Sequence, residues 1–166
     1  MRFIQICLIF LFTLLIFNNC QKPDPAVEEQ KIKEAIEKET QAFLDNDFTA
    51  WTSTYVHAPY SQLLGVDKNS LTEIIGWQAL QDSIRKYIKG DPKPSDTKII
   101  RKNFIIRNYG TGAWVTYDQW WGIDPEQNPD FKPSKQLRVL EKVDGEWKVI
   151  FMGHISRWEY FAPKNE

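Results

Sequence analysis

An aspartate in a tryptophan-rich run is the first residue whose surroundings suggest chemistry. Alternation along a strand places Asp118 on the same face as Trp114 and Trp120. A carboxyl group between two indoles loses hydration, which favours its neutral form and suits a general acid or base. The alternative is an ordinary strand aspartate that reaches solvent or pairs with a lysine.

His154 is the second catalytic candidate, near the end of the last apolar run. Histidine can shuttle protons near neutral pH. The alternative is a histidine that is hydrogen-bonded at a pocket floor or sheet edge. The expected strand order puts the segment Lys135–Val143 between Asp118 and His154, which separates them by roughly 9–10 Å. They could flank a ligand, but they could not easily hydrogen-bond each other.

No metal site or cofactor is expected. His57 precedes Pro59 in a loop, and the histidines and scattered carboxylates lack the spacing of metal ligands. The sequence has no glycine-rich phosphate loop, no nucleophile elbow and no Cys-x-x-Cys motif. The formal net charge is −1 and the basic residues form no stripe, so nucleic acid is not an expected partner.

Aromatic residues make up 14% of the chain and include seven tryptophans. A tryptophan-rich core accounts for this composition, and so does an aromatic-lined cavity. The second hypothesis predicts a small, largely apolar or aromatic ligand, because ligand sites combine apolar walls with few polar groups. The residues expected to line the pocket are Trp51, Tyr55, Trp77, Trp114, Trp120, Met152 and His154.

Helices are expected before strands, a pattern that predicts an α+β fold. Asp24 and Pro25 are typical of an N-cap and a first helical residue, and apolar residues then recur at helical spacing. This helix ends before Asp45. The other elements expected in this half are helices over Phe48–Tyr55 and Thr72–Lys89, a brief strand over Tyr60–Gly65 and a polar loop over Val66–Ser70.

From Thr97 the apolar period changes to two, which predicts strands. The expected strands are Thr97–Tyr109, Ala113–Trp121, Lys135–Val143 and Trp147–Trp158. The dipeptide Asp144-Gly145 predicts a two-residue hairpin turn that pairs Val139 with Ile150. In this register the pocket face holds Leu137, Val139, Ile150, Met152 and His154, whereas Arg138 lies on the opposite face.

The first residues predict an export signal. Met1–Asn19 combines Arg2 with a short apolar run, and Cys20 follows. This arrangement resembles a bacterial lipoprotein signal, which implies lipidation of Cys20 and a lipid-anchored protein of the cell envelope, facing the periplasm or the exterior. Because Asn18 and Asn19 replace the usual small residues, an uncleaved N-terminal anchor is the alternative.

Four segments in order resemble the NTF2-like superfamily, in particular its SnoaL-like branch with DUF4440-type domains. They are Phe43–Trp51 (FLDNDFTAW), Gly76–Leu80 (GWQAL), Gly112–Val115 (GAWV) and Asp144–Val149 (DGEWKV), followed by His154 and Ser156. The resemblance implies an NTF2-like (cystatin-like) cone, in which three helices wrap a curved antiparallel sheet, and a tendency to form homodimers through the sheet. The domains expected are a signal over 1–19, a tether over 20–24 and an NTF2-like domain over 25–162.

The resemblance does not determine function, because this fold carries enzymes, binding modules and assembly domains. Aligned with ketosteroid isomerases of the superfamily, the chain has Leu63 at the base position and Glu39 and Leu137 at the oxyanion hole, so that machinery is absent. Three hypotheses remain: a membrane-tethered ligand-binding domain, an enzyme that uses Asp118 or His154, and a dimeric assembly domain. The last would use exposed aromatic residues as its interface, namely Trp121, Trp158, Tyr160 and Phe161.

Overall fold

A computed structural model describes residues 24–67, 69–90 and 93–156. The first described helix, α2, spans Pro25–Leu44 as predicted. The carboxylate of Asp24 accepts a hydrogen bond from the Ala26 amide at 2.9 Å, and proline occupies the first turn, where a missing N–H is harmless. Asp47 caps α3 (Phe48–Ser53) in the same way, through the Ala50 amide at 2.8 Å.

The residues Ser70–Ile75 form a strand, which corrects the prediction of a helix that starts at Thr72. Strands β1 (Gln62–Asp67) and β2 (Ser70–Ile75) form an antiparallel pair, and α4 spans Trp77–Gly90. The predicted helix over Thr72–Lys89 therefore begins too early, and the predicted loop over Val66–Ser70 is partly strand. Gly76, at φ 90°, separates the strand from the helix in a conformation that favours glycine.

The remaining strands confirm the predicted change of period. They are β3 (Ile99–Asn108), β4 (Gly112–Trp121), β5 (Ser134–Val143) and β6 (Glu146–Ile155). The strand order in the sheet is β2-β1-β6-β5-β4-β3. All pairs are antiparallel except β1 with β6, so the sheet is mixed and not wholly antiparallel as expected.

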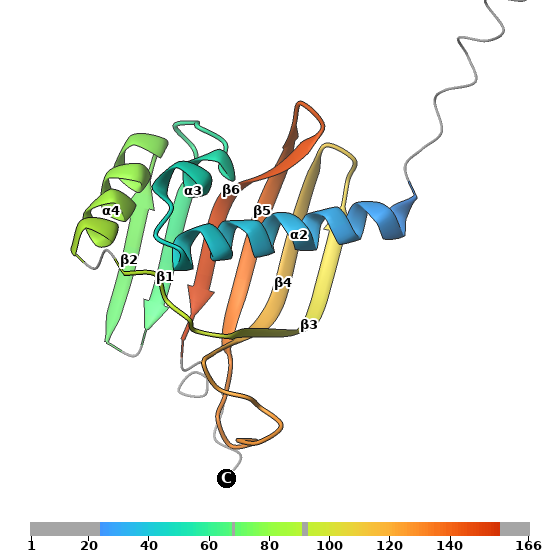
Figure 1. Cartoon of the computed structure of the whole chain (residues 1–166). Helices are drawn as coiled ribbons and strands as arrows, with labels where there is room; N and C mark the ends of the chain where they lie inside the picture. The colour runs from blue at the N-terminus through green and yellow to red at the C-terminus, as the bar shows by residue number, and fades with distance from the viewer. Residues whose placement is uncertain (1–23, 68, 91–92, 157–166) are drawn as a thin grey trace, which may run out of the picture.

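The helices lie on one face of the sheet (Figure 1), with α2 across it and α3 and α4 towards the β1–β2 end. The core lies between these layers and includes Ile32, Trp51, Leu80, Val115 and Leu140, each at most 1% exposed. No helix among the described residues is long and apolar enough to cross a membrane. We call the helix-covered side of the sheet the inner face and the other side the outer face.

A β-bulge in the last hairpin changes which residues reach the inner face. Asp144 and Gly145 form the predicted turn, with positive φ at both positions. Beyond it Leu140 pairs with Val149, but Val139 pairs with Phe151, so β6 contains an extra residue. The predicted pairing of Val139 with Ile150 is therefore wrong.

Candidate functional site

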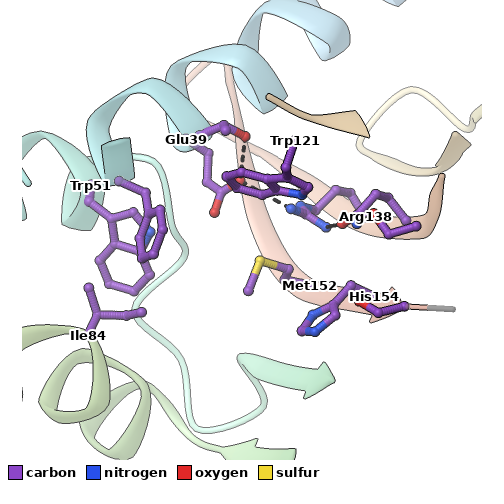
Figure 2. A pocket seen from close by; sticks show the side chains of 12 residues that line it. Glu39, Trp51, Ile84, Trp121, Arg138, Met152 and His154 are labelled. Atoms are coloured by element: carbon purple, nitrogen blue, oxygen red, sulfur yellow. Dashed lines mark hydrogen bonds and ion pairs between the residues drawn. The ribbon is translucent and has the colours of Figure 1, made fainter. Parts of the chain in front are cut away.

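The inner face encloses a cavity of about 240 Å³ between the sheet and the helices. Figure 2 shows Trp51 and Ile84 on one side of it and Arg138, Met152 and His154 on the other. Trp121 lies at its edge and is 43% exposed. The lining residues are Glu39, Thr40, Phe43, Trp51, Ile84, Trp121, Ser134, Gln136, Arg138, Met152, His154 and Ser156.

One wall of the cavity is aromatic. Trp51 on α3 is 1% exposed and stacks on Trp77 with ring centroids 5.9 Å apart. The ring centroids of Tyr55 and Trp51 are 4.5 Å apart, and the exposed His57 stacks on Trp77 with ring centroids 4.0 Å apart. The i, i+4 spacing of Trp51 and Tyr55, which straddles the end of α3, brings both rings inward, and such pairs contribute about 0.5–1.5 kcal/mol beyond their buried area.

The floor of the cavity contains a buried ion pair between Glu39 on α2 and Arg138 on β5. Nη2 of Arg138 lies 3.4 Å from Oε2 of Glu39, and each side chain is 4% exposed. The hydroxyl of Tyr55 donates to Oε1 of Glu39 at 3.1 Å. Burial, together with the nearby Glu39 charge, raises the pKa of Tyr55 well above its usual value, so this phenol stays neutral. An ion pair therefore lies at the base of the cavity, whose lining combines aromatic and aliphatic side chains with uncharged polar ones.

The bulge in β6 brings Met152 and His154 onto the face of Arg138, and this face lines the cavity, which corrects the prediction that Arg138 lies on the opposite face. Arg138 pairs with Met152 and Gln136 pairs with His154, so these four residues share the inner face. Leu137 and Val139, expected inside, point to the outer face instead. The side chain of Gln136 accepts a hydrogen bond from Nη1 of Arg138 at 3.2 Å.

His154 lies against a glycine on the neighbouring strand. A Cβ atom built on Gly65 would be 2.6 Å from Cε1 of His154, so the imidazole occupies the space that a side chain would fill. Burial lowers the pKa of His154 below its ordinary value of 6.5, and the Arg138 charge acts in the same direction, whereas Asp67 opposes it. The ring is therefore neutral at pH 7, with one donor and one acceptor nitrogen.

Asp118 lies on the outer face, apart from the cavity. It pairs with Lys135 across the strands, and Nζ of Lys135 approaches its Oδ1 at 2.5 Å. Asn103, at φ 58° in a β-bulge, donates to Oδ2 at 2.6 Å. Asp118 and His154 therefore lie on opposite faces and cannot act on the same substrate atom.

The predicted pocket residues divide into two groups. Trp51, Met152 and His154 line the cavity, and Tyr55 and Trp77 pack behind Trp51. Trp114 and Trp120 lie on the outer face together with Asp118. Nε1 of Trp120 donates a hydrogen bond to the Phe131 carbonyl at 3.0 Å.

Glu39 was named only at the position aligned with an oxyanion hole and was not among the residues predicted to line the pocket. A signal was available, because Ile32, Ile36, Glu39 and Phe43 recur at helical spacing and place a carboxylate on the apolar stripe of α2. A buried carboxylate requires a partner, and that partner is Arg138. Across the described ranges, no group of three histidine, cysteine, aspartate or glutamate side chains could hold a metal ion.

Comparison with known proteins gives the fold class. No family model and no curated protein matches the sequence. An NTF2-like protein of unknown function from Shewanella baltica is 21% identical with a TM-score of 0.55, covering 80% of this chain and 96% of its own. An NTF2-like protein of unknown function from Pseudomonas putida is 15% identical with a TM-score of 0.57, covering 78% of this chain and 87% of its own.

A third solved structure is also similar to this chain. A cystatin-like fold protein from Burkholderia xenovorans is 14% identical with a TM-score of 0.54, covering 76% of this chain and 88% of its own. The chain therefore has the α+β NTF2-like, or cystatin-like, fold. At these identities the likeness shows the fold alone, and the SnoaL-like branch stays a prediction.

Proposed function

We propose that this NTF2-like domain binds a small, largely apolar or aromatic ligand in the inner-face cavity, beside a membrane. The observation that carries the proposal is the combination of an aromatic wall at Trp51 with a charged floor at Glu39 and Arg138. Apolar walls fix a ligand by burial, and a few polar groups orient it. An apolar core position would not ordinarily keep a buried ion pair, because replacing such a pair by apolar residues is often neutral or stabilising.

The size of the cavity sets the size of the ligand. Its volume is about 240 Å³. A dry cavity of about 150 Å³ accepts benzene. The cavity therefore has room for one aromatic ring with a short substituent, and not for a polycyclic molecule.

Native mass spectrometry of the full-length chain, released gently from detergent, tests the proposal. We expect a co-purifying small molecule that is lost in Met152→Trp, because the larger side chain fills the cavity from a wall position. Val139→Ile adds volume on the outer face and is the matched control. Wild-type protein without adduct, combined with no binding in a screen of small aromatic compounds, would contradict ligand binding.

The membrane tether is the second part of the proposal. It rests on the signal-like Met1–Asn19 and on Cys20, which lie outside the described residues. Acyl chains contribute about 0.8 kcal/mol per buried CH₂, so more than one chain gives firm attachment. Expression in a bacterial host with radiolabelled palmitate should label the wild type and not Cys20→Ala. Equal labelling of both proteins would contradict lipidation at this cysteine.

A second candidate function, assembly of two copies, is favoured by the outer face. A hollow of about 400 Å³ lies there, with Leu64, Val66, Leu137, Phe151 and Ile155 among its lining residues. Apolar patches of this kind mark interaction surfaces. Light scattering should give a dimer mass for the wild type and a monomer mass for Phe151→Asp, whereas a monomeric wild type would contradict it. Of the four aromatic residues predicted to form the interface, Trp121 lies at the edge of the inner-face cavity. The other three, Trp158, Tyr160 and Phe161, lie outside the described residues.

A further inference from the structure

The charges around the inner-face cavity cancel each other. Glu39 and Arg138 are the two ionised side chains among its described lining residues, and they form the buried pair of the floor. Arg101 donates to the lining residue Thr40 and forms an ion pair with Glu37. A charged ligand would therefore bring an uncompensated charge into the interior, where burying such a charge is costly. The cavity favours a ligand without net charge.

The polar groups at the floor already have partners within the protein. The side-chain amide of Gln136 donates to Oγ of Ser134 at 2.8 Å and accepts from Arg138. Ser134 in turn donates to the Gln119 carbonyl at 3.1 Å, and Thr40 donates to a carbonyl oxygen of its own helix at 3.0 Å. These hydrogen bonds hold the floor together, so the groups that make them are engaged before a ligand enters.

His154 differs from these groups, because its imidazole makes no hydrogen bond to any described residue. Figure 2 shows its ring directed from β6 towards the cavity, beside Met152. Its neighbour on β1 is Gly65, which has no side chain that could serve as a partner. The ring is partly buried, so its nitrogens lose hydration without gaining a protein partner. A ligand atom that bonds to the ring would restore the lost hydrogen bond.

A hydroxyl group is the simplest uncharged partner for this imidazole. A neutral imidazole has one N–H donor and one acceptor nitrogen, and a hydroxyl oxygen can donate to the second or accept from the first. It therefore fits either tautomer of His154. An ether oxygen can only accept, and amines and carboxylates are charged at pH 7.

We propose that the ligand is an uncharged aromatic hydroxyl compound with one ring, its hydroxyl hydrogen-bonded to His154 and its ring against Trp51 and Ile84 on the other side of the cavity. The inference rests on the proposed ligand-binding function and names the chemical class of that ligand. A cavity of about 240 Å³ has room for one ring with a short substituent. A phenol suits the site, because its pKa of about 10 keeps it neutral at pH 7.

Isothermal titration calorimetry on the full-length chain in phosphatidylcholine nanodiscs tests the proposal, with empty nanodiscs as the blank for partitioning into lipid. The probes share one methylated ring and are para-cresol, its methyl ether and para-toluate. We expect para-cresol to bind at least about fivefold more tightly than the ether, which cannot donate a hydrogen bond. It should bind at least about tenfold more tightly than para-toluate, whose charge has no uncompensated partner in the cavity.

Two substitutions of His154 separate hydrogen bonding from packing. His154→Phe keeps a ring but has no polar atom, so para-cresol should lose its advantage over the methyl ether. His154→Gln keeps a donor and an acceptor and should retain an advantage of at least about twofold. Tyr109→Phe, which removes a polar atom from a 72% exposed aromatic residue, is the control and should leave the advantage unchanged.

The outcomes separate this proposal from the proposed function. Equal binding of para-cresol and its ether overturns the hydroxyl assignment and leaves ligand binding intact, and tighter binding of para-toluate does the same. An advantage that disappears in both His154 variants, or in neither, overturns the role of the imidazole. Failure of every probe to bind also overturns the proposal, and the co-purification experiment then decides independently whether the cavity holds another kind of ligand. Should His154→Phe fail to fold, the three probes on the wild type and on His154→Gln still decide.

Discussion

Glu39 and Arg138 are 99 positions apart in the chain, yet they form an ion pair in which each side chain is 4% exposed. Glu39 comes from the apolar stripe of α2, and Arg138 comes from the centre of β5. The pair thus joins the helical layer to the sheet at the floor of the cavity. Its removal should affect stability as well as binding.

Glu39→Gln should lower the free energy of unfolding by about 3 kcal/mol, because it leaves the Arg138 charge buried without its partner. Urea denaturation at pH 7 measures the change. Glu34→Gln, at an exposed glutamate of the same helix, is the control and should stay within about 0.5 kcal/mol of wild type. The double variant Glu39→Leu/Arg138→Met should recover most of the loss. A cost below about 1 kcal/mol for Glu39→Gln would contradict a fully buried pair.

Gly65→Ala should disturb the cavity through His154. The added Cβ would lie 2.6 Å from the imidazole, so the ring must move. We expect a loss of about 1–3 kcal/mol in stability, as for other overpacked sites. In a His154→Ala background the same substitution should be nearly neutral, and this double-mutant cycle isolates the contact. Equal costs in both backgrounds would contradict it. Gly90→Ala, where nothing lies within 4 Å, is the control.

Local signals predict much of this fold. The Asp24-Pro25 pair marks the start of α2, Asp47 caps α3, and Asp144-Gly145 sets the last turn. Each of these caps and turns depends on hydrogen bonds or dihedral angles within a few residues, so the local sequence is enough to predict it. Strand β2 was missed because its apolar residues also fit a helical spacing, and its pairing with β1 decides the outcome.

The register of the site could not be predicted from alternation. Val149, Ile150 and Phe151 are all apolar, so nothing in the pattern reveals which one is the extra residue of the bulge. A one-residue slip exchanges the faces of a strand, and this exchange put Met152 and His154 on the face of Arg138 instead of the face of Leu137 and Val139. The ion pair between Arg138 and Glu39 shows which face of β5 is the inner one, but it exists only when α2 is packed against β5.

Stability should fall in mild acid through His154. Its folded-state pKa lies below the ordinary value of 6.5 because the ring is buried. Between the folded and unfolded pKa values the unfolded chain binds more protons, so stability is full above the unfolded pKa and is lost as pH falls through this window. The melting temperature of the wild type should therefore drop more than that of His154→Gln between about pH 7.5 and 5.5. Parallel curves would contradict a depressed pKa.

Acid sensitivity at lower pH should come from Glu28, which is a second anchor of α2 on the sheet. Its carboxylate contacts Nζ of Lys142 at 2.5 Å, Nζ of Lys31 at 2.9 Å and Nε1 of Trp147 at 3.1 Å. The hydrogen bond from Lys142, followed by that from Lys31, lowers the pKa of Glu28 from 4.5 to about 2. The ionised form is therefore favoured in the folded state.

Because the folded-state pKa is depressed, Glu28 stabilises the fold fully above pH 4.5 and loses this contribution as pH falls towards about 2. Glu28→Gln should lower the urea midpoint at neutral pH, and the difference from wild type should shrink steadily through this window. Glu29→Gln, at the exposed neighbouring glutamate, should leave the midpoint unchanged at both ends. A deficit for Glu28→Gln that stays constant down to about pH 2 would show that the side chain acts through packing and not through its charge.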